Sequence, residues 1–163
     1  MSTRDGCIIL TLATGARVED LQMKQVVAAV IERKDRRLLI GQRRRQDTSP
    51  LKWEFPGGKV RNGETLEGAL ARELREELGA TLVKFQKIAE ARHQYAHFPE
   101  ELEIHFFAAA IAEAEVLPHA FERLEWVLPK ELGRYDFLTA NRRLIAELAT
   151  GKLKPGEILD HDG

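Results

Sequence analysis

The chain has 163 residues, 44% hydrophobic and 31% charged, with a net charge of −1. This length suits one domain with a real hydrophobic core, and the near-zero charge excludes a bulk electrostatic attraction to nucleic acid. The single cysteine, Cys7, excludes an internal disulfide and a cysteine-rich zinc site, and no apolar run approaches the roughly 20 residues that span a bilayer. Residues 1–5 lack the order of a secretory signal, so we expect a cytoplasmic protein without a membrane or stable nucleic-acid partner.

Two apolar runs near the start of the chain predict a β-hairpin. Val26–Ile31 and Leu38–Gly41 are compact and apolar, and a charged turn separates them. Residues 1–23 before them have no clear period and are expected to form an N-terminal extension. After them, a polar loop at 43–50 leads to a short extended segment, Trp53–Phe55, and the Pro-Gly-Gly that follows is expected to end it.

Leu66–Leu78 is the clearest helix of the chain. Its leucines recur every four residues, which places them on one helical face. Thr65 is suited to cap the first turn, and Gly79 lies just past the last one. A second helix is expected at Thr139–Thr150, and Gly151 is expected to stop it.

Strands and helices are mixed along the chain. We expect the later strands at Leu82–Glu90, Ile104–Ile111 and Glu125–Val127. This pattern indicates a single domain of the α/β or α+β class, spanning residues 24–151. The polar segment 152–163 is expected to be a flexible C-terminal tail.

Three carboxylates share one face of the central helix. Glu73, Glu76 and Glu77 stand at i, i+3 and i+4, and like charges at that spacing repel by roughly 0.2–0.5 kcal/mol per pair. Two explanations are open at this point. The first is a solvated charged face, and the second is a platform for a divalent cation, because hard cations such as Mg²⁺ prefer carboxylate oxygens.

The surrounding residues favour the second explanation. The segment GKVRNGETLEGALARELREELGA, which begins at Gly58, resembles the Nudix box, G-x5-E-x7-R-E-U-x-E-E-x-G-U, where U is a bulky aliphatic residue. The positions in register are Gly58, Glu64, Arg72, Glu73, Leu74, Glu76, Glu77 and Gly79. Only the last position departs, since Ala80 is smaller than the usual residue. A chance match at the seven positions that require one named residue has a probability of about 10⁻⁸ per starting point.

This resemblance implies a Nudix fold, a mixed β-sheet sandwiched between helices, and an enzyme that cleaves phosphoanhydrides. In this family the box glutamates are catalytic and bind Mg²⁺, or sometimes Mn²⁺. The matching carboxylates here are Glu73, Glu76 and Glu77. The backbone carbonyl of Gly58 commonly completes the metal site, and Glu64 and Arg72 resemble the pair that locks the loop onto the helix. Which carboxylate takes the proton from water is left open.

Two further segments, WEFPGGKVRNGET and LEWVLPKELGRYDFLTANRRLI, are similar to the MutT-like branch of the family, which hydrolyses nucleoside triphosphates such as 8-oxo-dGTP. On this resemblance, Asn141 reads the oxidised base, Phe55 lines its pocket and Arg43 lies close to the nucleotide. The alternatives are that Asn141 belongs to the first turn of a helix, Phe55 to the core, and Arg43 to a solvated loop. A further metal-binding glutamate of this branch has no clean counterpart, and Glu122 is the first candidate, followed by Glu125.

The resemblance therefore predicts a Mg²⁺-dependent pyrophosphohydrolase that converts oxidised dGTP to the monophosphate and pyrophosphate, in nucleotide-pool sanitation and DNA repair. One alternative is a CTP, dCTP or other nucleoside triphosphate pyrophosphohydrolase of the same branch; in the cytidine enzymes Asp tends to replace the base-reading Asn. Another is a nucleotide-binding module without turnover, a class that generally loses box glutamates. The expected partner is the small nucleotide, and the chain is a monomer or a homodimer. The histidines show no pattern typical of a metal site, and we expect core or surface positions for them.

Overall fold

The computed structural model describes residues 23–96 and 99–161. The strands are β1 (Lys24–Ile31), β2 (Leu38–Gln42), β3 (Trp53–Glu54), β4 (Gly57–Lys59), β5 (Leu82–His93), β6 (Leu102–Ile111) and β7 (Arg123–Val127). The helices are α2 (Leu66–Leu78), α3 (Arg142–Ala149) and α4 (Pro155–Asp160), with 3₁₀ turns at Pro129–Arg134 and Thr139–Asn141. Almost all of the predicted N-terminal extension lies outside the described residues.

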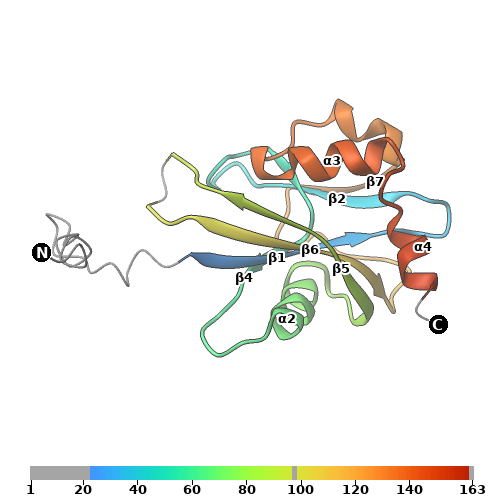
Figure 1. Ribbon diagram of the computed structural model, residues 1–163, viewed down its shortest axis with the longest axis horizontal. Helices are drawn as coiled ribbons and strands as arrows, with labels where there is room; N and C mark the ends of the chain where they lie inside the picture. Colours follow the sequence, from blue (N-terminus) through green and yellow to red (C-terminus); the bar gives the residue numbers. More distant parts are fainter. Residues whose placement is uncertain (1–22, 97–98, 162–163) are drawn as a thin grey trace, which may run out of the picture.

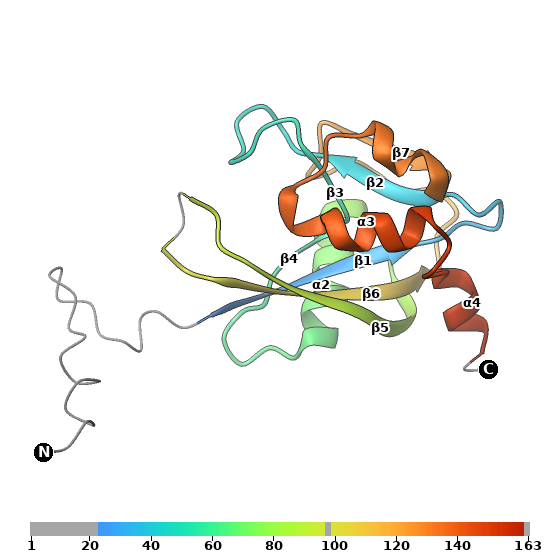
Figure 2. The same ribbon diagram turned by 45° about the horizontal axis from the view of Figure 1, so that its top comes forward.

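The strands form two sheets. One has the order β4-β1-β6-β5 and the other β3-β2-β7. Strands β1 and β6 run parallel, and the other neighbours run antiparallel. Helix α2 covers one face of the four-stranded sheet, and α3 lies on the opposite side (Figures 1 and 2). The prediction of a single mixed domain with a sheet between helices is therefore confirmed.

The predicted hairpin of β1 and β2 is wrong. Apart from the single bridge between Glu32 and Leu38, the two strands pair within different sheets. Residues 27–31 and 38–41 are buried without alternation. Strands that are buried on both faces have continuous apolar runs, and such runs do not reveal which strand is the partner.

The Pro-Gly-Gly segment does not simply end a strand, because it carries the chain from one sheet to the other. Strand β3 belongs to the three-stranded sheet, and β4, which pairs with β1, belongs to the four-stranded sheet. Gly57 faces Ala28 there, and a Cβ atom on Gly57 would lie 1.9 Å from the carbonyl oxygen of Val27. Only glycine permits so close an approach of the two backbones.

Helix α2 has the bounds that the sequence predicts. The Thr65 hydroxyl accepts a hydrogen bond from the Gly68 N–H at 3.0 Å, and Gly79 closes the helix with a φ of 64°. The buried residues of α2 are Ala69, Leu70, Leu74 and Leu78. Each leucine buried in this way contributes about 1.5–3 kcal/mol relative to an exposed one. This packing fixes the helix against the sheet and holds the adjacent carboxylates in place.

The C-terminal segment differs from the expected flexible tail. Residues 155–160 form α4, which begins with Pro155, and Leu159 is buried. The Lys84 ammonium donates to the Leu159 carbonyl, and the Gly156 N–H donates to Glu32 Oε2 at 3.3 Å. Only two residues of α4, Pro155 and Leu159, are buried. Two apolar positions are too few to show the helical recurrence of apolar residues, so the sequence does not reveal this helix. In the described parts of the chain, no helix is both long enough and apolar enough to cross a membrane.

Candidate functional site

Two carboxylates of α2 meet the two glycines of β4. The Gly57 N–H donates a hydrogen bond to Glu77 Oε1 at 2.8 Å. A Cβ atom on Gly58 would lie 2.4 Å from Glu73 Oε1, so the absence of a side chain at Gly58 makes room for that carboxylate. The helix thus presents two acidic side chains to consecutive residues of one edge strand.

Arg72 joins the loop between β4 and α2 to the helix. Its guanidinium donates to Glu64 through Nε at 2.7 Å and Nη2 at 2.9 Å, and to the Lys59 carbonyl at 3.0 Å. Through Nη1 it donates to Glu73 Oε1 at 2.8 Å. The hydrogen bonds from Arg72 and from the Arg61 N–H lower the pKa of Glu64 to about 2. Glu64 is therefore ionised at neutral pH, and Glu64 and Arg72 are in contact, as a loop-locking pair requires.

Glu76 lies at the solvent side of the same cluster. Its side chain is 50% exposed, 3.3 Å from Arg72 Nη1 and 3.7 Å from Arg61 Nη2. The three glutamates that the box places on α2 therefore differ in environment, because Glu73 and Glu77 lie against β4 and Glu76 is open to water. Such an exposed carboxylate can approach an incoming cation without breaking the core.

Glu77 lies in an unfavourable electrostatic environment. Burial, together with the nearby Glu54 and Glu73, raises the pKa of its carboxyl group to about 9. The donor atoms gathered here are carboxylate oxygens, which are the ligands that hard divalent cations prefer. A cation would offset this repulsion, so the residues present fit a divalent metal.

This environment predicts a dependence of stability on pH. In the metal-free folded protein, Glu77 holds a proton at neutral pH. In the unfolded chain its carboxyl group has a pKa of about 4.3 and has already lost that proton. Folding stability should therefore fall as pH rises from about 5 to 9. In EDTA we expect Tm of the wild type to fall between pH 6 and pH 8.5. This fall should be larger, by at least about 3 °C, than the fall of Tm in Glu77→Gln, which lacks the titrating carboxyl group. Parallel curves of Tm against pH would contradict this pKa assignment, and saturating Mg²⁺ should reduce the difference.

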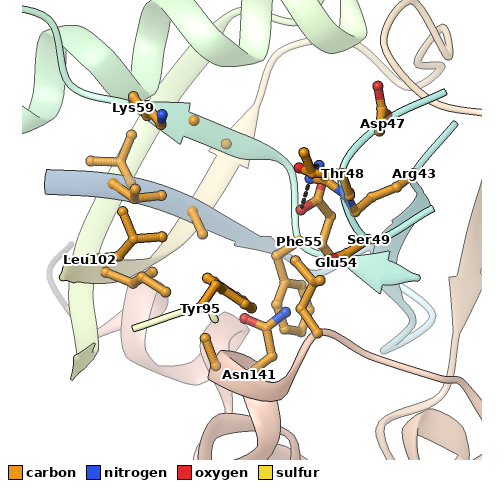
Figure 3. Close-up of a pocket in the computed structure, with 18 of the residues that line it drawn as sticks. Arg43, Asp47, Thr48, Ser49, Glu54, Phe55, Lys59, Tyr95, Leu102 and Asn141 are labelled. Atoms are coloured by element: carbon orange, nitrogen blue, oxygen red, sulfur yellow. Dashed lines mark hydrogen bonds and ion pairs between the residues drawn. The ribbon is translucent and has the colours of Figure 1, made fainter. Parts of the chain in front are cut away.

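A cavity of about 780 Å³ opens beside Glu77 and Glu54, which both line it. It extends from Gly57, Gly58, Lys59 and Glu77 to Tyr95 and Asn141. Arg43 lies at its side, where Nη1 donates to both oxygens of Glu54 at 3.2 and 3.0 Å and Nε donates to the Thr48 carbonyl at 2.7 Å (Figure 3). The Arg43 side chain is only 21% exposed, so it is not part of a solvated loop.

The other end of the cavity combines aromatic rings with an amide. Phe55 is 3% exposed and packs on Phe137 with ring centroids 5.7 Å apart, yet it also lines the cavity. Figure 3 shows Phe55, Tyr95 and Asn141 gathered at one side of this space. Asn141 is 5% exposed, and its side chain does not cap α3. Within the described residues its amide makes no hydrogen bond, so both its donor and its acceptor are available to a ligand.

The two candidates for a further metal-binding glutamate, Glu122 and Glu125, form their ion pairs and hydrogen bonds with residues outside the box. The Glu122 carboxylate is 40% exposed and lies 3.9 Å from Arg45 Nε. Glu125 accepts a hydrogen bond from the Tyr135 hydroxyl at 2.7 Å. Among the residues that the structure describes, neither carboxylate contacts Glu73 or Glu77, and the role of Glu122 stays a prediction.

Sequence reasoning missed Glu54, Tyr95 and Gly57. Burial raises the pKa of Glu54, while its ion pair with Arg43 acts in the opposite direction. One feature of the sequence could have revealed Glu54: it is an acidic residue between two aromatic residues in a short strand. Such a position predicts a buried charge, and a buried charge needs a partner. Tyr95 has no comparable feature, since it follows β5 in a segment without any period.

Comparison with known proteins identifies relatives over most of the chain. The family model of the NUDIX domain matches residues 23–158. A CTP pyrophosphohydrolase from Escherichia coli is 33% identical over 138 residues, which cover 84% of this chain and 100% of that protein. An 8-oxo-dGTP diphosphatase from the same organism is 31% identical over 125 residues, which cover 76% of this chain and 95% of that protein. Among solved structures, a MutT NUDIX hydrolase from Burkholderia pseudomallei has a TM-score of 0.65 at 28% identity, covering 77% of this chain and 97% of that one.

Proposed function

This chain belongs to the NUDIX family and is a MutT-type hydrolase of phosphoanhydride bonds; on that premise we propose that it is a Mg²⁺-dependent nucleoside triphosphate pyrophosphohydrolase that prefers oxidised dGTP. The observation that carries the proposal is the position of Glu73 and Glu77 against β4, where Glu77 lines a cavity that also reaches the amide of Asn141. Hydrolysis would yield the monophosphate and pyrophosphate. A cytoplasmic location and the oligomeric state stay predictions.

The proposed roles follow from the chemistry of each side chain. Glu73, Glu76 and Glu77, with the carbonyl of Gly58, would hold the metal, which would neutralise phosphate charge and lower the pKa of a bound water. Arg72 positions Glu73 through the hydrogen bond at 2.8 Å and is itself oriented by Glu64.

The reaction replaces one phosphorus–oxygen bond of the anhydride by a bond to the water oxygen, and a proton must leave that water. A carboxylate of the box is the acceptor that the site offers for this proton. Glu77, whose pKa is raised by burial and by its acidic neighbours, must first lose its own proton before it binds a cation or accepts another proton. Arg43, held by Glu54, contributes positive charge at the cavity wall beside the phosphates.

Asn141 supports a preference for an oxidised purine. Guanine presents two acceptors, N7 and O6, on its major-groove edge. Oxidation at C8 places a hydrogen on N7, so that the edge presents one donor beside one acceptor. An amide matches this pair, because its NH₂ group donates and its carbonyl accepts. With unmodified guanine, the amide oxygen would face the N7 lone pair.

A cytidine triphosphate is the second candidate substrate. The observation in its favour is the 33% identity to a protein named CTP pyrophosphohydrolase. The cytidine enzymes tend to carry Asp at the base-reading position, whereas this chain has Asn141. A binding module without turnover is less well supported, because all four glutamates of the box are present.

The deciding experiment is a comparison of kcat/KM for 8-oxo-dGTP, dGTP, CTP and dCTP, each with Mg²⁺ and with EDTA. We expect Mg²⁺-dependent release of pyrophosphate, with the highest value for 8-oxo-dGTP. A highest value for CTP would replace the first candidate by the second. No turnover of any of the four would leave a binding module as the explanation.

Replacing Asn141 by alanine tests the base-reading role. We expect the ratio of kcat/KM for 8-oxo-dGTP over dGTP to fall by about fivefold or more, since the hydrogen bond of about 1 kcal/mol to the N7 hydrogen, which only the oxidised base offers, is lost. Thr139→Ala is the matched control, because Thr139 is exposed and lies in the same 3₁₀ turn. An unchanged ratio in Asn141→Ala would remove Asn141 from the base site.

A further inference from the structure

Three potential metal ligands lie together on strands β5 and β6. Glu90 faces His105 across the two strands, and Glu103 precedes His105 by two residues on the same strand. One ligand atom of each residue, a carboxylate oxygen or a ring nitrogen, lies within 4.8 Å of the others. Residues two apart on a strand point to the same face, so all three side chains gather on one side of the sheet.

His105 is the unusual member of this cluster. It is 4% exposed, and both of its ring nitrogens are buried without a hydrogen-bond partner. A buried polar group without a partner costs about 1–3 kcal/mol, so native proteins rarely leave one unless a ligand or an ion satisfies it. Burial, with the nearby Lys87, lowers the pKa of His105, so its imidazole is neutral at neutral pH and a nitrogen lone pair is available.

The spacing of the donor atoms suits a small ion. His105 Nε2 lies 3.2 Å from Glu103 Oε1. Two ligands at about 2.1 Å from a tetrahedral metal are about 3.4 Å apart, so this separation is that of two neighbours in one coordination sphere. The same two atoms do not form a hydrogen bond. An ion pair between them would require a protonated His105, whereas a cation bound between them would satisfy both atoms.

The charges around the cluster leave access for a cation. The Lys87 ammonium lies 2.9 Å from Glu90, and an Arg92 nitrogen lies 3.8 Å from Glu103. The side chains of Lys87 and Arg92 are 38% and 61% exposed. Exposed ion pairs of this kind contribute only about 0–1 kcal/mol, so both cations can turn into solvent when a metal enters.

This cluster is separate from the candidate nucleotide site. Side chains alternate between the two faces along a strand. Leu102 and Ile104 line the cavity, and Ile104 belongs to the core cluster that includes Leu144 of α3. Glu103 and His105 therefore point to the opposite face of β6, on the side where Phe107 packs against α2.

We propose that Glu90, Glu103 and His105 form a second metal site, selective for a divalent cation of the zinc type. An imidazole ligand favours Zn²⁺ and similar ions over Mg²⁺, which prefers oxygen ligands alone. The ion would satisfy a ring nitrogen of His105 and would tie β5 to β6 next to the end of β5. This proposal does not depend on the substrate or on the activity of the nucleotide site.

The test is Zn²⁺ binding to the full-length chain, measured by equilibrium dialysis with Mg²⁺ in large excess. We expect His105→Gln to bind one Zn²⁺ fewer per chain than the wild type, or to bind it at least tenfold more weakly, since the loss of even an outer-shell partner of a metal ligand typically lowers metal affinity by about 10–100-fold. Glu103→Gln, which is nearly isosteric, should show the same loss. Circular dichroism and thermal unfolding establish that each variant is folded.

Two controls separate this site from the box glutamates. His119→Gln and Glu115→Gln change exposed residues of the same types and should retain the wild-type number of Zn²⁺ ions. Glu73→Gln should also retain the Zn²⁺ ion that His105→Gln loses. Equal Zn²⁺ stoichiometry and affinity in the wild type, His105→Gln and Glu103→Gln would overturn the proposal, and so would a loss in Glu73→Gln alone.

Discussion

Glu77→Gln should lower kcat for nucleoside triphosphate hydrolysis by roughly 10²–10⁴-fold, the range expected when an acid–base or metal-binding carboxylate is removed. The glutamine side chain keeps an oxygen that can accept the hydrogen bond from the Gly57 N–H, which is 2.8 Å from Glu77 Oε1 in the wild type. The substitution also removes a carboxyl group whose pKa is raised by burial and by Glu54 and Glu73. The fold should therefore survive, while a carboxyl group that would ionise on binding the metal is lost. Steady-state kinetics over a range of Mg²⁺ concentrations measures both effects.

Glu67→Gln is the matched control for this variant. Glu67 lies on the same helix, in its first turn, and is exposed. Its replacement should leave kcat and the Mg²⁺ dependence unchanged. Wild-type turnover in Glu77→Gln would show that the metal is held by other residues, and the proposed assignment of the box glutamates would then fail.

Gly57→Ala should both destabilise the fold and impair the site. The new Cβ would lie 1.9 Å from the Val27 carbonyl oxygen and 2.8 Å from the Val27 carbonyl carbon, and neither backbone atom can move without disturbing the pairing of β1 with β4. Overpacking of this kind costs about 1–3 kcal/mol, and each kcal/mol lowers Tm by about 2–4 °C in a domain of this size. Because the Gly57 N–H also holds Glu77, the apparent affinity for Mg²⁺ should fall with the stability.

Gly133→Ala provides the comparison for the glycine variant. Apart from the adjoining backbone, no atom of the described residues lies within 4 Å of a Cβ placed on Gly133, which is exposed in a 3₁₀ turn. Its Tm should stay close to that of the wild type. Differential scanning calorimetry of the two alanine variants checks this difference, and equal Tm values for Gly57→Ala and the wild type would contradict the close contact with Val27.

The sequence predicts the parts of the fold that have a strong local pattern. Helix α2 has the predicted bounds because its leucine spacing, its Thr65 cap and its terminal Gly79 all agree. The pairing of β1 with β6, far apart in sequence, has no local pattern, so the sequence predicts a hairpin with β2 instead. Helix α4 escapes prediction for a similar reason, since it is held by contacts with β5 and β6 rather than by its own period.

The candidate site follows the same division. The box residues are predictable because a fixed spacing on a loop and a helix brings Glu64, Arg72 and Glu73 together. The approach of Glu54 and Arg43 to the carboxylates depends on how β2 and β3 pack, and their sequence positions do not show it. The unmet hydrogen-bonding capacity of His105 could not be predicted either, because a histidine in an apolar strand is usually a satisfied core residue.

Pro56 lies in the two-residue link between the two sheets, which joins β3 to β4. Phe55, beside the proposed base pocket, follows β3 directly, whereas Gly57, beside the proposed metal site, begins β4. The distance between the proposed base pocket and the proposed metal site is thus set by how the two sheets lie on each other. Core residues such as Val30 and Ile40, which belong to one cluster joining both sheets, therefore become determinants of substrate length although neither lines the cavity. Selection for a new substrate in this chain should accordingly yield changes in the core between the sheets as well as in the cavity wall.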